Sequence, residues 1–300
     1  MDPTQDVTIR PMATADVPEA REVSWSALRE AGTRYGWELP PLTDALRARG
    51  EAQFRHLLAT DPDGLAVAEA DGRVVGVGQA IRRGPLWFLC LLTVAPSAQA
   101  GGIGRRLLET VSATRAGASL GAICATADPK ALRRYRQAGF DLHPGYEAKG
   151  TLDRSLLPAV RDVREGSFAD DRDLVESVVT GLRGAGHGPD LDLWSAGGPR
   201  LLVNDGPSGR GYAVVGEGGP VVLGASSPDA ATRLLWACLA ESTADEVHAS
   251  WITAGQQWAI DVVLGARLTL RPSGSVCRAG ALAGGTVPPW SPYLPSGSLG

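Results

Sequence analysis

A glycine-rich turn in the first half of the chain has the residue types needed to bind a diphosphate. It reads Val94-Ala-Pro-Ser-Ala-Gln-Ala-Gly-Gly-Ile-Gly-Arg105 and connects an apolar segment to a segment of helical periodicity. Glycine lets the backbone adopt positive φ and lets a bulky anion approach the free N–H groups at a helix N-terminus, where the helix dipole adds attraction. Many strand-to-helix turns use glycine for packing alone, so the turn by itself leaves a structural role open.

Two common nucleotide-binding motifs do not fit this turn. A P-loop requires Gly-Lys-Ser/Thr at the start of the helix, whereas this chain has Gly104-Arg105-Arg106 there. A Rossmann turn follows the first strand of its unit, whereas we expect this turn to follow the fourth strand. Another class of phosphate-containing ligand is therefore favoured.

A second segment has the signals of one short helix and contains a tyrosine. It reads Asp128-Pro-Lys-Ala-Leu-Arg-Arg-Tyr-Arg-Gln-Ala-Gly-Phe140. Proline suits the first helical position, and Gly139 suits the left-handed residue that ends a helix. Asp128 is favoured as the N-cap, and a general base or a substrate carboxylate is the alternative.

The elements that position these two segments form an α/β pattern. The dipeptide Asp71-Gly72 joins two apolar runs and predicts a hairpin, because both central residues of a type I′ turn need positive φ. The run PLWFLCLLTV is apolar without alternation, as a strand buried on both faces should be. In chain order we expect a strand at 7–12, helices at 17–30 and 43–58, strands at 65–70, 73–82 and 85–94, a helix at 105–115, a strand at 122–125, a helix at 129–138 and a strand at 140–150.

These segments, in this order, resemble the GNAT superfamily of acyl-CoA-dependent N-acetyltransferases. The family's first motif, a Val-x-Pro on the fourth strand followed by Gln/Arg-x-x-Gly-x-Gly/Ala, is matched without a gap by Val94, Pro96, Gln99, Gly102 and Gly104. The segment from Asp128 to Phe140 is similar to the second motif, except that the family's usual asparagine is Asp128 here. The resemblance covers the whole first half.

The resemblance implies a site for acetyl-CoA. The backbone of Leu92 and Val94 would hydrogen-bond the acetyl carbonyl and the pantetheine arm, and the N–H groups from Gln99 to Arg105 would hold the pyrophosphate. Tyr135 would be the general acid that serves the departing thiolate, and a core aromatic is the alternative. The residues expected to bind the cofactor are Leu92, Thr93, Val94, Gln99, Ala100, Gly101, Gly102, Ile103, Gly104, Arg105 and Asp128.

The resemblance implies acetyl transfer by direct attack of the primary amine of a small molecule. Family members often place a glutamate on the fourth strand as general base, but residues 86–94 contain no acid or histidine. The proton of the amine could instead be taken by a water chain, by Asp128 or by Glu69, or the amine could already be partly neutral; the sequence leaves these alternatives open. We expect the binding site of the acceptor amine to have an aromatic wall formed by Trp25, Tyr35 and Trp37. A non-catalytic acyl-CoA sensor or scaffold is the alternative function.

The second half repeats the start of the first. Ile9-Arg10 and Ala15-Asp16 reappear as Val163-Arg164 and Ala169-Asp170, each shifted by 154 positions. We therefore expect a tandem GNAT architecture, in which each copy is a mixed, mostly antiparallel sheet flanked by helices. The expected parts are a catalytic domain at 1–155, a degenerate copy at 156–287 and a C-terminal tail at 288–300.

Two features suggest that the second copy is inactive. Its counterpart of the glycine-rich turn, Ala225 to Thr232, contains no glycine and carries Asp229, and Asp261 stands where Tyr135 should be. The run Gly181-Leu-Arg-Gly-Ala-Gly-His-Gly188 follows a helix rather than a strand, so we expect a flexible loop. His187 in this loop has no partner at catalytic or metal spacing, and a surface or capping role is expected.

Composition excludes several classes of protein. At 300 residues with 44% hydrophobic and 21% charged residues, the chain is neither disordered nor a disulfide miniprotein. A net charge of -4 argues against nucleic acid as a partner, and no apolar run approaches the roughly 20 residues that span a bilayer. The N-terminus lacks the pattern of a signal peptide, so we expect a cytoplasmic protein without membrane contact. The four cysteines are far apart in the sequence, so we expect buried free thiols and no metal site. We expect a monomer or a homodimer.

Overall fold

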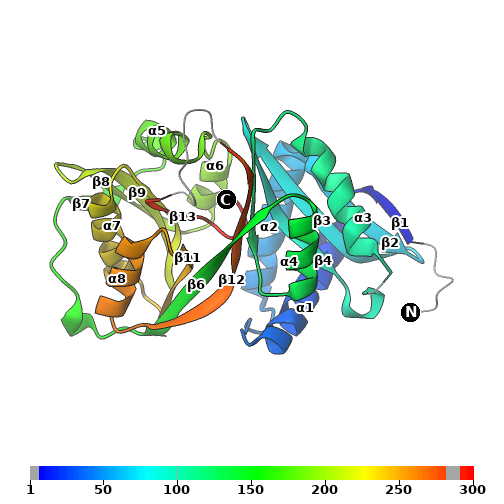
Figure 1. Cartoon of the computed structure of the whole chain (residues 1–300), viewed down its shortest axis with the longest axis horizontal. Helices are drawn as coiled ribbons and strands as arrows, with labels where there is room; N and C mark the ends of the chain where they lie inside the picture. The colour runs from blue at the N-terminus through cyan, green and yellow to red at the C-terminus, as the bar shows by residue number, and fades with distance from the viewer. Residues whose placement is uncertain (1–6, 100, 282–290) are drawn as a thin grey trace. The chain divides into compact units, whose positions relative to one another are not determined.

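The computed structural model describes residues 7–99, 101–281 and 291–300. The chain divides into two compact units, one of Met1–Arg82 with Trp87–Ala118 and one of Arg83–Leu86 with Ser119–Gly300. Both units contain helices and strands, and the sheets are mostly antiparallel (Figure 1). The predicted fold class is therefore confirmed.

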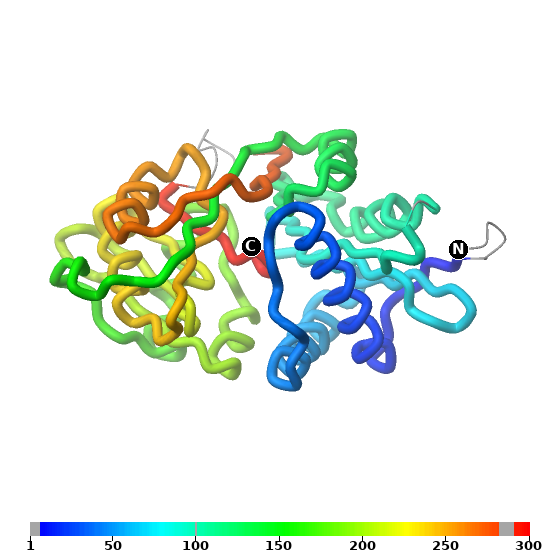
Figure 2. The backbone as a smooth tube through the Cα atoms, turned by 90° about the horizontal axis from the view of Figure 1, so that it is seen from below, coloured from blue at the N-terminus to red at the C-terminus, as the bar shows by residue number. Residues whose placement is uncertain are grey.

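The first unit is a sheet flanked by helices. Its strands β1 (Val7–Pro11), β2 (Leu65–Ala70), β3 (Arg73–Arg83) and β4 (Leu86–Val94) are neighbours in that order. Its helices are α1 (Val17–Tyr35), α2 (Asp44–Thr60) and α3 (Ile103–Ser112). In Figure 1, α3 lies in front of the sheet and α1 and α2 lie behind it, and Figure 2 shows α1 and α2 side by side.

Local sequence explains the elements of this unit. The β2–β3 turn has φ of 50° at Asp71 and 72° at Gly72, as the predicted type I′ turn requires. The Thr43 hydroxyl caps α2 by accepting the N–H of Leu46 at 3.3 Å. Helix α1 ends at Tyr35, past the predicted end at residue 30, and Gly36 with φ of 82° is its C-cap.

The side chains of β4 do not alternate strictly between the two faces of the sheet. The Trp87 indole N–H donates to Thr114 Oγ1 at 3.0 Å, just after α3, whereas the Thr93 hydroxyl donates to Ser24 Oγ of α1 at 3.2 Å. Residues six positions apart would share a face in a regular strand. The alternation is therefore broken between Trp87 and Thr93, in the strand that leads into the glycine-rich turn.

The second unit contains more strands and helices than the first. Its elements are β5 (Leu120–Ala125), α4 (Pro129–Gln137), β6 (Asp141–Thr151), β7 (Val163–Gly166), α5 (Arg172–Arg183), α6 (Asp190–Ala196), β8 (Arg200–Gly206), β9 (Gly209–Gly216), β10 (Gly219–Ala225), α7 (Pro228–Glu241), β11 (Glu246–Thr253), α8 (Gln257–Gly265), β12 (Thr269–Gly280) and β13 (Tyr293–Leu294). Five of the strands form one sheet in the order β13-β10-β9-β8-β7. Four others are neighbours in the order β5-β12-β6-β11.

The order of the second set of strands shows that the two halves of the sequence exchange strands. β12, from the end of the chain, pairs antiparallel with β5 and with β6, both from the first half. β6 in turn pairs with β11 of the second half. The sheet pairing therefore crosses residue 155, and the expected domain limits stay a prediction.

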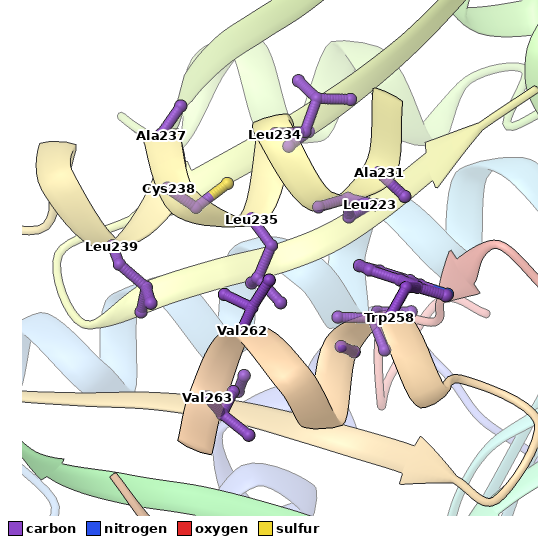
Figure 3. Close-up of a cluster of buried hydrophobic side chains, with 14 of the residues drawn as sticks. Leu223, Ala231, Leu234, Leu235, Ala237, Cys238, Leu239, Trp258, Val262 and Val263 are labelled. Atoms are coloured by element: carbon purple, nitrogen blue, oxygen red, sulfur yellow. The ribbon is translucent and has the colours of Figure 1, made fainter. Parts of the chain in front are cut away.

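The apolar core of the second unit lies between α7, α8 and the neighbouring strands. Figure 3 shows side chains of α7 and α8 directed toward one another, with Leu223 of β10 beside them. Leu235, Val263 and Leu223 are fully buried. Helix α7 begins after Ser227, whose hydroxyl accepts the N–H of Ala230 at 3.1 Å.

The predicted repeat has a structural basis, with one correction. Arg10 of β1 forms a bidentate ion pair with Asp16, and this carboxylate also accepts the N–H of Ala13. In the second half, Arg164 of β7 forms the same kind of pair with Asp171. The acid that matches Asp16 is therefore Asp171 and not Asp170, because the second copy holds one more residue before its helix.

Candidate functional site

The glycine-rich turn opens the N-terminus of α3 toward solvent. Gly102 is the N-cap residue with φ of 73°, and no side-chain cap is present among the residues described for this helix end. Gly101, Gly102 and Arg105 are exposed, while Ile103 and Gly104 are buried. Ala100 lies outside the described residues. The first N–H groups of α3 are thus not occupied by a side chain, as an anion site requires.

Side-chain and backbone contacts fix the start of this turn. The Gln99 side-chain amide donates to the carbonyl oxygen of Val94 at 3.3 Å, and the Ala95 N–H donates to the carbonyl oxygen of Val75 at 2.8 Å. Thr93 is buried, while Leu92 and Val94 are half-buried. The structure brings these expected cofactor residues onto one strand end and one turn, and their binding roles stay a prediction.

The two other expected site residues lie on α4 in the second unit. Asp128 is the N-cap, and its carboxylate oxygen Oδ1 accepts the N–H of Lys130 at 2.8 Å, so the predicted cap is confirmed. Tyr135 is 5% exposed. Burial raises the pKa of the Tyr135 hydroxyl above its ordinary value, and the neighbouring thiol of Cys277 on β12 acts in the same direction. The phenol is therefore neutral and a hydrogen-bond donor at physiological pH.

The three aromatic residues expected at the acceptor wall lie on α1 and on the segment that follows it. The Trp25 indole N–H donates to the carbonyl oxygen of Pro40 at 3.2 Å, and the Arg21 guanidinium lies 4.4 Å from the centre of the Trp25 ring. The Trp37 N–H donates to the carbonyl oxygen of Gly32 at 3.0 Å. Trp25, Tyr35 and Trp37 are half-buried, and their role toward an acceptor stays a prediction.

A cavity of about 510 Å³ in the first unit does not include these aromatic residues. It lies beside the N-terminal part of α1, and it is lined by Glu19, Glu22, Glu51, Arg47 and Arg73 together with apolar side chains. Glu19 pairs with Arg73, Glu22 with Arg47 and Glu51 with Arg55. The carboxylates that line this cavity are therefore already neutralised by arginines of the protein.

The second half has a different helix start where the glycine-rich turn would be. Ser227 caps α7 through its hydroxyl, and Asp229 adds a negative charge in the first turn. Asp261 on α8 is exposed. This helix N-terminus is therefore already satisfied by the protein and carries the wrong charge for a phosphate.

His187 is not at the surface, which corrects the sequence-based expectation. It is fully buried, and its Nδ1 lies 3.0 Å from Arg183 Nη2 while its Nε2 lies 2.5 Å from Tyr212 Oη. Because the guanidinium can only donate, Nδ1 accepts and Nε2 carries the proton that is donated to Tyr212. Burial, followed by the charges of Arg183 and Arg83, holds the pKa of His187 well below its usual value.

The described residues contain neither a metal-binding cluster nor a helix that could cross a membrane. In the described ranges, no group of three or more His, Cys, Asp or Glu side chains is arranged to hold a metal ion. No helix of the described residues combines the length and the apolar character needed to cross a membrane. The four cysteines are free thiols, three buried and Cys124 half-buried.

Comparisons with known proteins agree with the motifs. The family model of the acetyltransferase (GNAT) domain matches residues 47–150, which include both segments. No curated protein matches the sequence of this chain.

Solved structures show the same fold along the whole chain. A Pyrococcus horikoshii protein assigned as an acetyltransferase is 18% identical, with a TM-score of 0.77 over 98% of this chain and 96% of the other. A GCN5-related N-acetyltransferase from Sphaerobacter thermophilus is 16% identical, with a TM-score of 0.57 over 94% and 98%. A tandem GNAT protein from the clavulanic acid biosynthesis pathway is 17% identical, with a TM-score of 0.57 over 94% and 100%.

The matched domain, the two motifs and the shared fold agree with one another. GNAT acetyltransferases transfer acyl groups from acyl-CoA, and this reaction class is what the match supports for the present chain. Residues 47–150 thus match the GNAT acetyltransferase domain, and the chain has the fold of solved GNAT structures, including a tandem GNAT protein.

Proposed function

We propose that this protein transfers the acetyl group of acetyl-CoA to the primary amine of a small molecule. The amine nitrogen attacks the thioester carbonyl, a C–N bond forms and the C–S bond breaks. The amine loses one proton and the departing thiolate of CoA gains one, so that the products are an N-acetylated amine and free CoA. No metal takes part in this scheme.

The uncapped N-terminus of α3 is the observation that carries the proposal. Gly102 holds the left-handed conformation that presents the following N–H groups, and a diphosphate is the anion that such a turn accommodates. The contrast with α7, whose start is capped by Ser227, supports assignment of the cofactor to the first half. We assign catalysis to residues 1–155 and a non-catalytic, bracing role to the second half.

Tyr135 serves the leaving group in this scheme. Its raised pKa keeps the hydroxyl protonated, so it can donate a hydrogen bond to the sulfur on which negative charge develops. A thiol has an ordinary pKa of about 8.5 and a phenol of about 10, so complete proton transfer to the thiolate is uphill. Stabilisation by the hydrogen bond, with the proton delivered later from solvent, fits these values.

The acceptor enters as the neutral amine. β4 reads LWFLCLLTV, without an acid or a histidine to remove a proton from an ammonium group. The rate should therefore rise with pH as the neutral fraction of the acceptor increases. The same feature favours the second candidate function, an acyl-CoA sensor that catalyses nothing.

Release of CoA thiol separates the two candidates. Purified protein is incubated with acetyl-CoA and a panel of primary amines, and free thiol and acetylated product are both measured. Amine-dependent release with equimolar product supports the transferase. Calorimetric binding of acetyl-CoA without release by any amine at pH 7 to 9 would instead identify a sensor, and absence of binding would exclude both.

A further inference from the structure

Gln79 is a buried amide without a partner in the apolar middle of a strand. It lies on β3, is 0% exposed, and is preceded by VVGVG and followed by Ala80 and Ile81. Within the part of the chain that the structure describes, neither Oε1 nor Nε2 has a hydrogen-bond partner. The side chain therefore keeps two donor hydrogens and two acceptor lone pairs unused.

The direction of Gln79 follows from its neighbours on β3. A Cβ on Gly76 would meet Leu107 at 3.0 Å and one on Gly78 would meet Val111 at 3.1 Å, so both positions face α3. Alternation along the strand then directs Gln79 to the opposite face, which α1 and α2 cover (Figure 1). It points away from the helix that carries the glycine-rich turn.

Another polar pair on that face already satisfies itself. Ser24 of α1 and Thr93 of β4 are 1% and 6% exposed, and their hydroxyls are hydrogen-bonded to each other. Gln79 differs from them because it has no such internal partner. β3 is the neighbour of β4, the strand whose Leu92 and Val94 are expected to bind the acyl-CoA arm.

A buried amide is normally paired because the loss of its bonds to water is otherwise uncompensated. A leucine would fill the same space without that cost. The partner of Gln79 must come from outside the protein atoms described, which leaves a bound water or a ligand.

We infer that Gln79 binds a hydroxyl or carboxamide group of the acceptor amine. This inference rests on the proposed function and specifies its substrate class. A hydroxyl or carboxamide both donates and accepts, so it pairs Oε1 and Nε2 together. An alkyl group pairs neither, and an ammonium group only donates and leaves Nε2 unpaired. The acceptor is thus an amine with a second polar group.

Entry of the acceptor requires movement of the cover over Gln79. The connection between α1 and α2 is held to α1 by the bonds from Trp25 to Pro40 and from Trp37 to Gly32. The two helices are also joined directly, since the Arg21 guanidinium of α1 donates to the carbonyl oxygen of Leu46 in α2 at 3.1 Å. Opening of α1 and α2 at this connection admits the acceptor and leaves the glycine-rich turn in place.

Two pairs of amines test the assignment. Ethanolamine and propylamine differ by a hydroxyl in place of a methyl group, and so do tyramine and 4-methylphenethylamine. We expect the wild-type protein to favour the hydroxylated member at least tenfold in kcat/KM. Gln79→Leu should reduce this preference at least tenfold while the KM for acetyl-CoA stays constant. The ratio between variants cancels the different basicities of the amines.

Val77→Ile is the matched control, since it changes the packing on the same face of β3 and removes no polar group. It should retain the wild-type preference. Gln79→Leu should melt at the wild-type temperature or above, because it removes an unpaired polar group. A lower melting temperature with an unchanged preference would overturn the inference and assign an internal water to Gln79. An equal loss for both members of each pair would also overturn it.

Failure of the proposed function gives a different result. If the protein binds acetyl-CoA but acetylates none of the four amines, calorimetric titration of each amine into the CoA complex replaces kinetics. If ethanolamine or tyramine binds more tightly than its methyl analogue, and if Gln79→Leu abolishes this preference, Gln79 binds the hydroxyl group in a protein that is a sensor and not a transferase. Equal binding of both members, or no binding, would overturn it.

Discussion

Arg83 and Asp190 form an ion pair that is almost completely removed from solvent. Arg83 Nη2 lies 2.7 Å from Asp190 Oδ1 and Nε lies 3.0 Å from Oδ2, and the side chains are 8% and 0% exposed. The guanidinium also donates to the carbonyl oxygen of His187 at 3.2 Å. Arg83 ends β3 and Asp190 begins α6, so the turn that leads into β4 is anchored on a helix of the second half.

Loss of Arg83 should destabilise the protein strongly. Arg83→Met leaves the Asp190 carboxylate buried without its cation, which costs about 3–5 kcal/mol. Urea denaturation at pH 7 measures this change in the free energy of unfolding. The double variant Arg83→Met with Asp190→Leu should recover most of the loss, because no unpaired charge remains. A single variant within about 0.5 kcal/mol of wild type would contradict the burial of the pair.

The strand exchange depends on a glycine in β12. Gly274 has φ of 42° at the irregularity between Ser273 and Ser275, and a Cβ there would lie 2.0 Å from the carbonyl oxygen of Ala125 on β5. Gly274→Ala should therefore lower the free energy of unfolding by at least about 2 kcal/mol. Gly181→Ala in α5 is the control, since nothing lies within 4 Å and alanine favours a helix by about 1 kcal/mol. Equal melting temperatures of the two variants would disprove the close approach.

Features that depend on neighbouring residues were predicted correctly from the sequence. The type I′ turn at Asp71-Gly72 and the Asp128 cap each involve residues within a few positions, and their backbone geometry is local. Gly139, predicted as the left-handed helix terminator, has φ of 87°. The fold class followed from such elements together with the motif order.

Features that depend on distant residues were not predicted. The burial of His187 comes from Tyr212 and Arg183, and the pairing of β12 with β5 joins segments about 150 residues apart. Gln79 was missed for a similar reason. Its one sequence signal is a carboxamide in the run VVGVGQAI, and only packing shows that it has no partner. The sequence could therefore name candidate residues on the turn, on α4 and among the aromatic residues of α1, whereas a buried amide without a partner is visible only in the packed structure.

Acid should destabilise the second unit through His187. Its folded pKa lies well below 6.5 because of burial, whereas the unfolded chain binds a proton near 6.5. The unfolded state therefore gains protons first, and stability falls as pH drops below 6.5, by up to about 1.4 kcal/mol per unit. Comparison of urea denaturation at pH 7, 6 and 5 for wild type and His187→Gln should show a shallower loss in the variant. Identical slopes would mean that His187 is protonated in the folded protein.

The acyl-CoA site should respond to charge at Gly102. Asp and Asn tolerate the left-handed conformation of this residue about equally, so Gly102→Asp and Gly102→Asn differ mainly by one negative charge. We expect the acetyl-CoA Kd of the Asp variant to be at least about tenfold higher than that of the Asn variant, and less so at high salt. Asp229→Asn in the second half should leave the Kd unchanged, with one acetyl-CoA bound per chain by calorimetry. A stoichiometry of two would show that the second copy also binds.

Tyr135→Phe should separate catalysis from packing. The phenylalanine keeps the ring that α4 buries and removes only the hydroxyl, which in our scheme donates to the leaving thiolate. The ground-state thioester makes little demand on that donor, so the loss should fall on kcat, by about 10²-fold or more, while the acetyl-CoA Kd stays nearly constant. Steady-state kinetics with an accepted amine and calorimetry measure the two quantities. Tyr146→Phe on β6 removes a hydroxyl that has no role in the scheme and should retain wild-type turnover.

The melting temperature of the Tyr135→Phe variant decides how its rate is read. An unchanged melting temperature with a lower kcat assigns the hydroxyl to the reaction. A parallel fall in affinity and melting temperature would assign Tyr135 to the core of the second unit, where its neighbour Cys277 also lies fully buried. Equal turnover of wild type and variant from pH 7 to 10 would mean that solvent or another group serves the sulfur, because a neutral phenol is available as donor throughout this range.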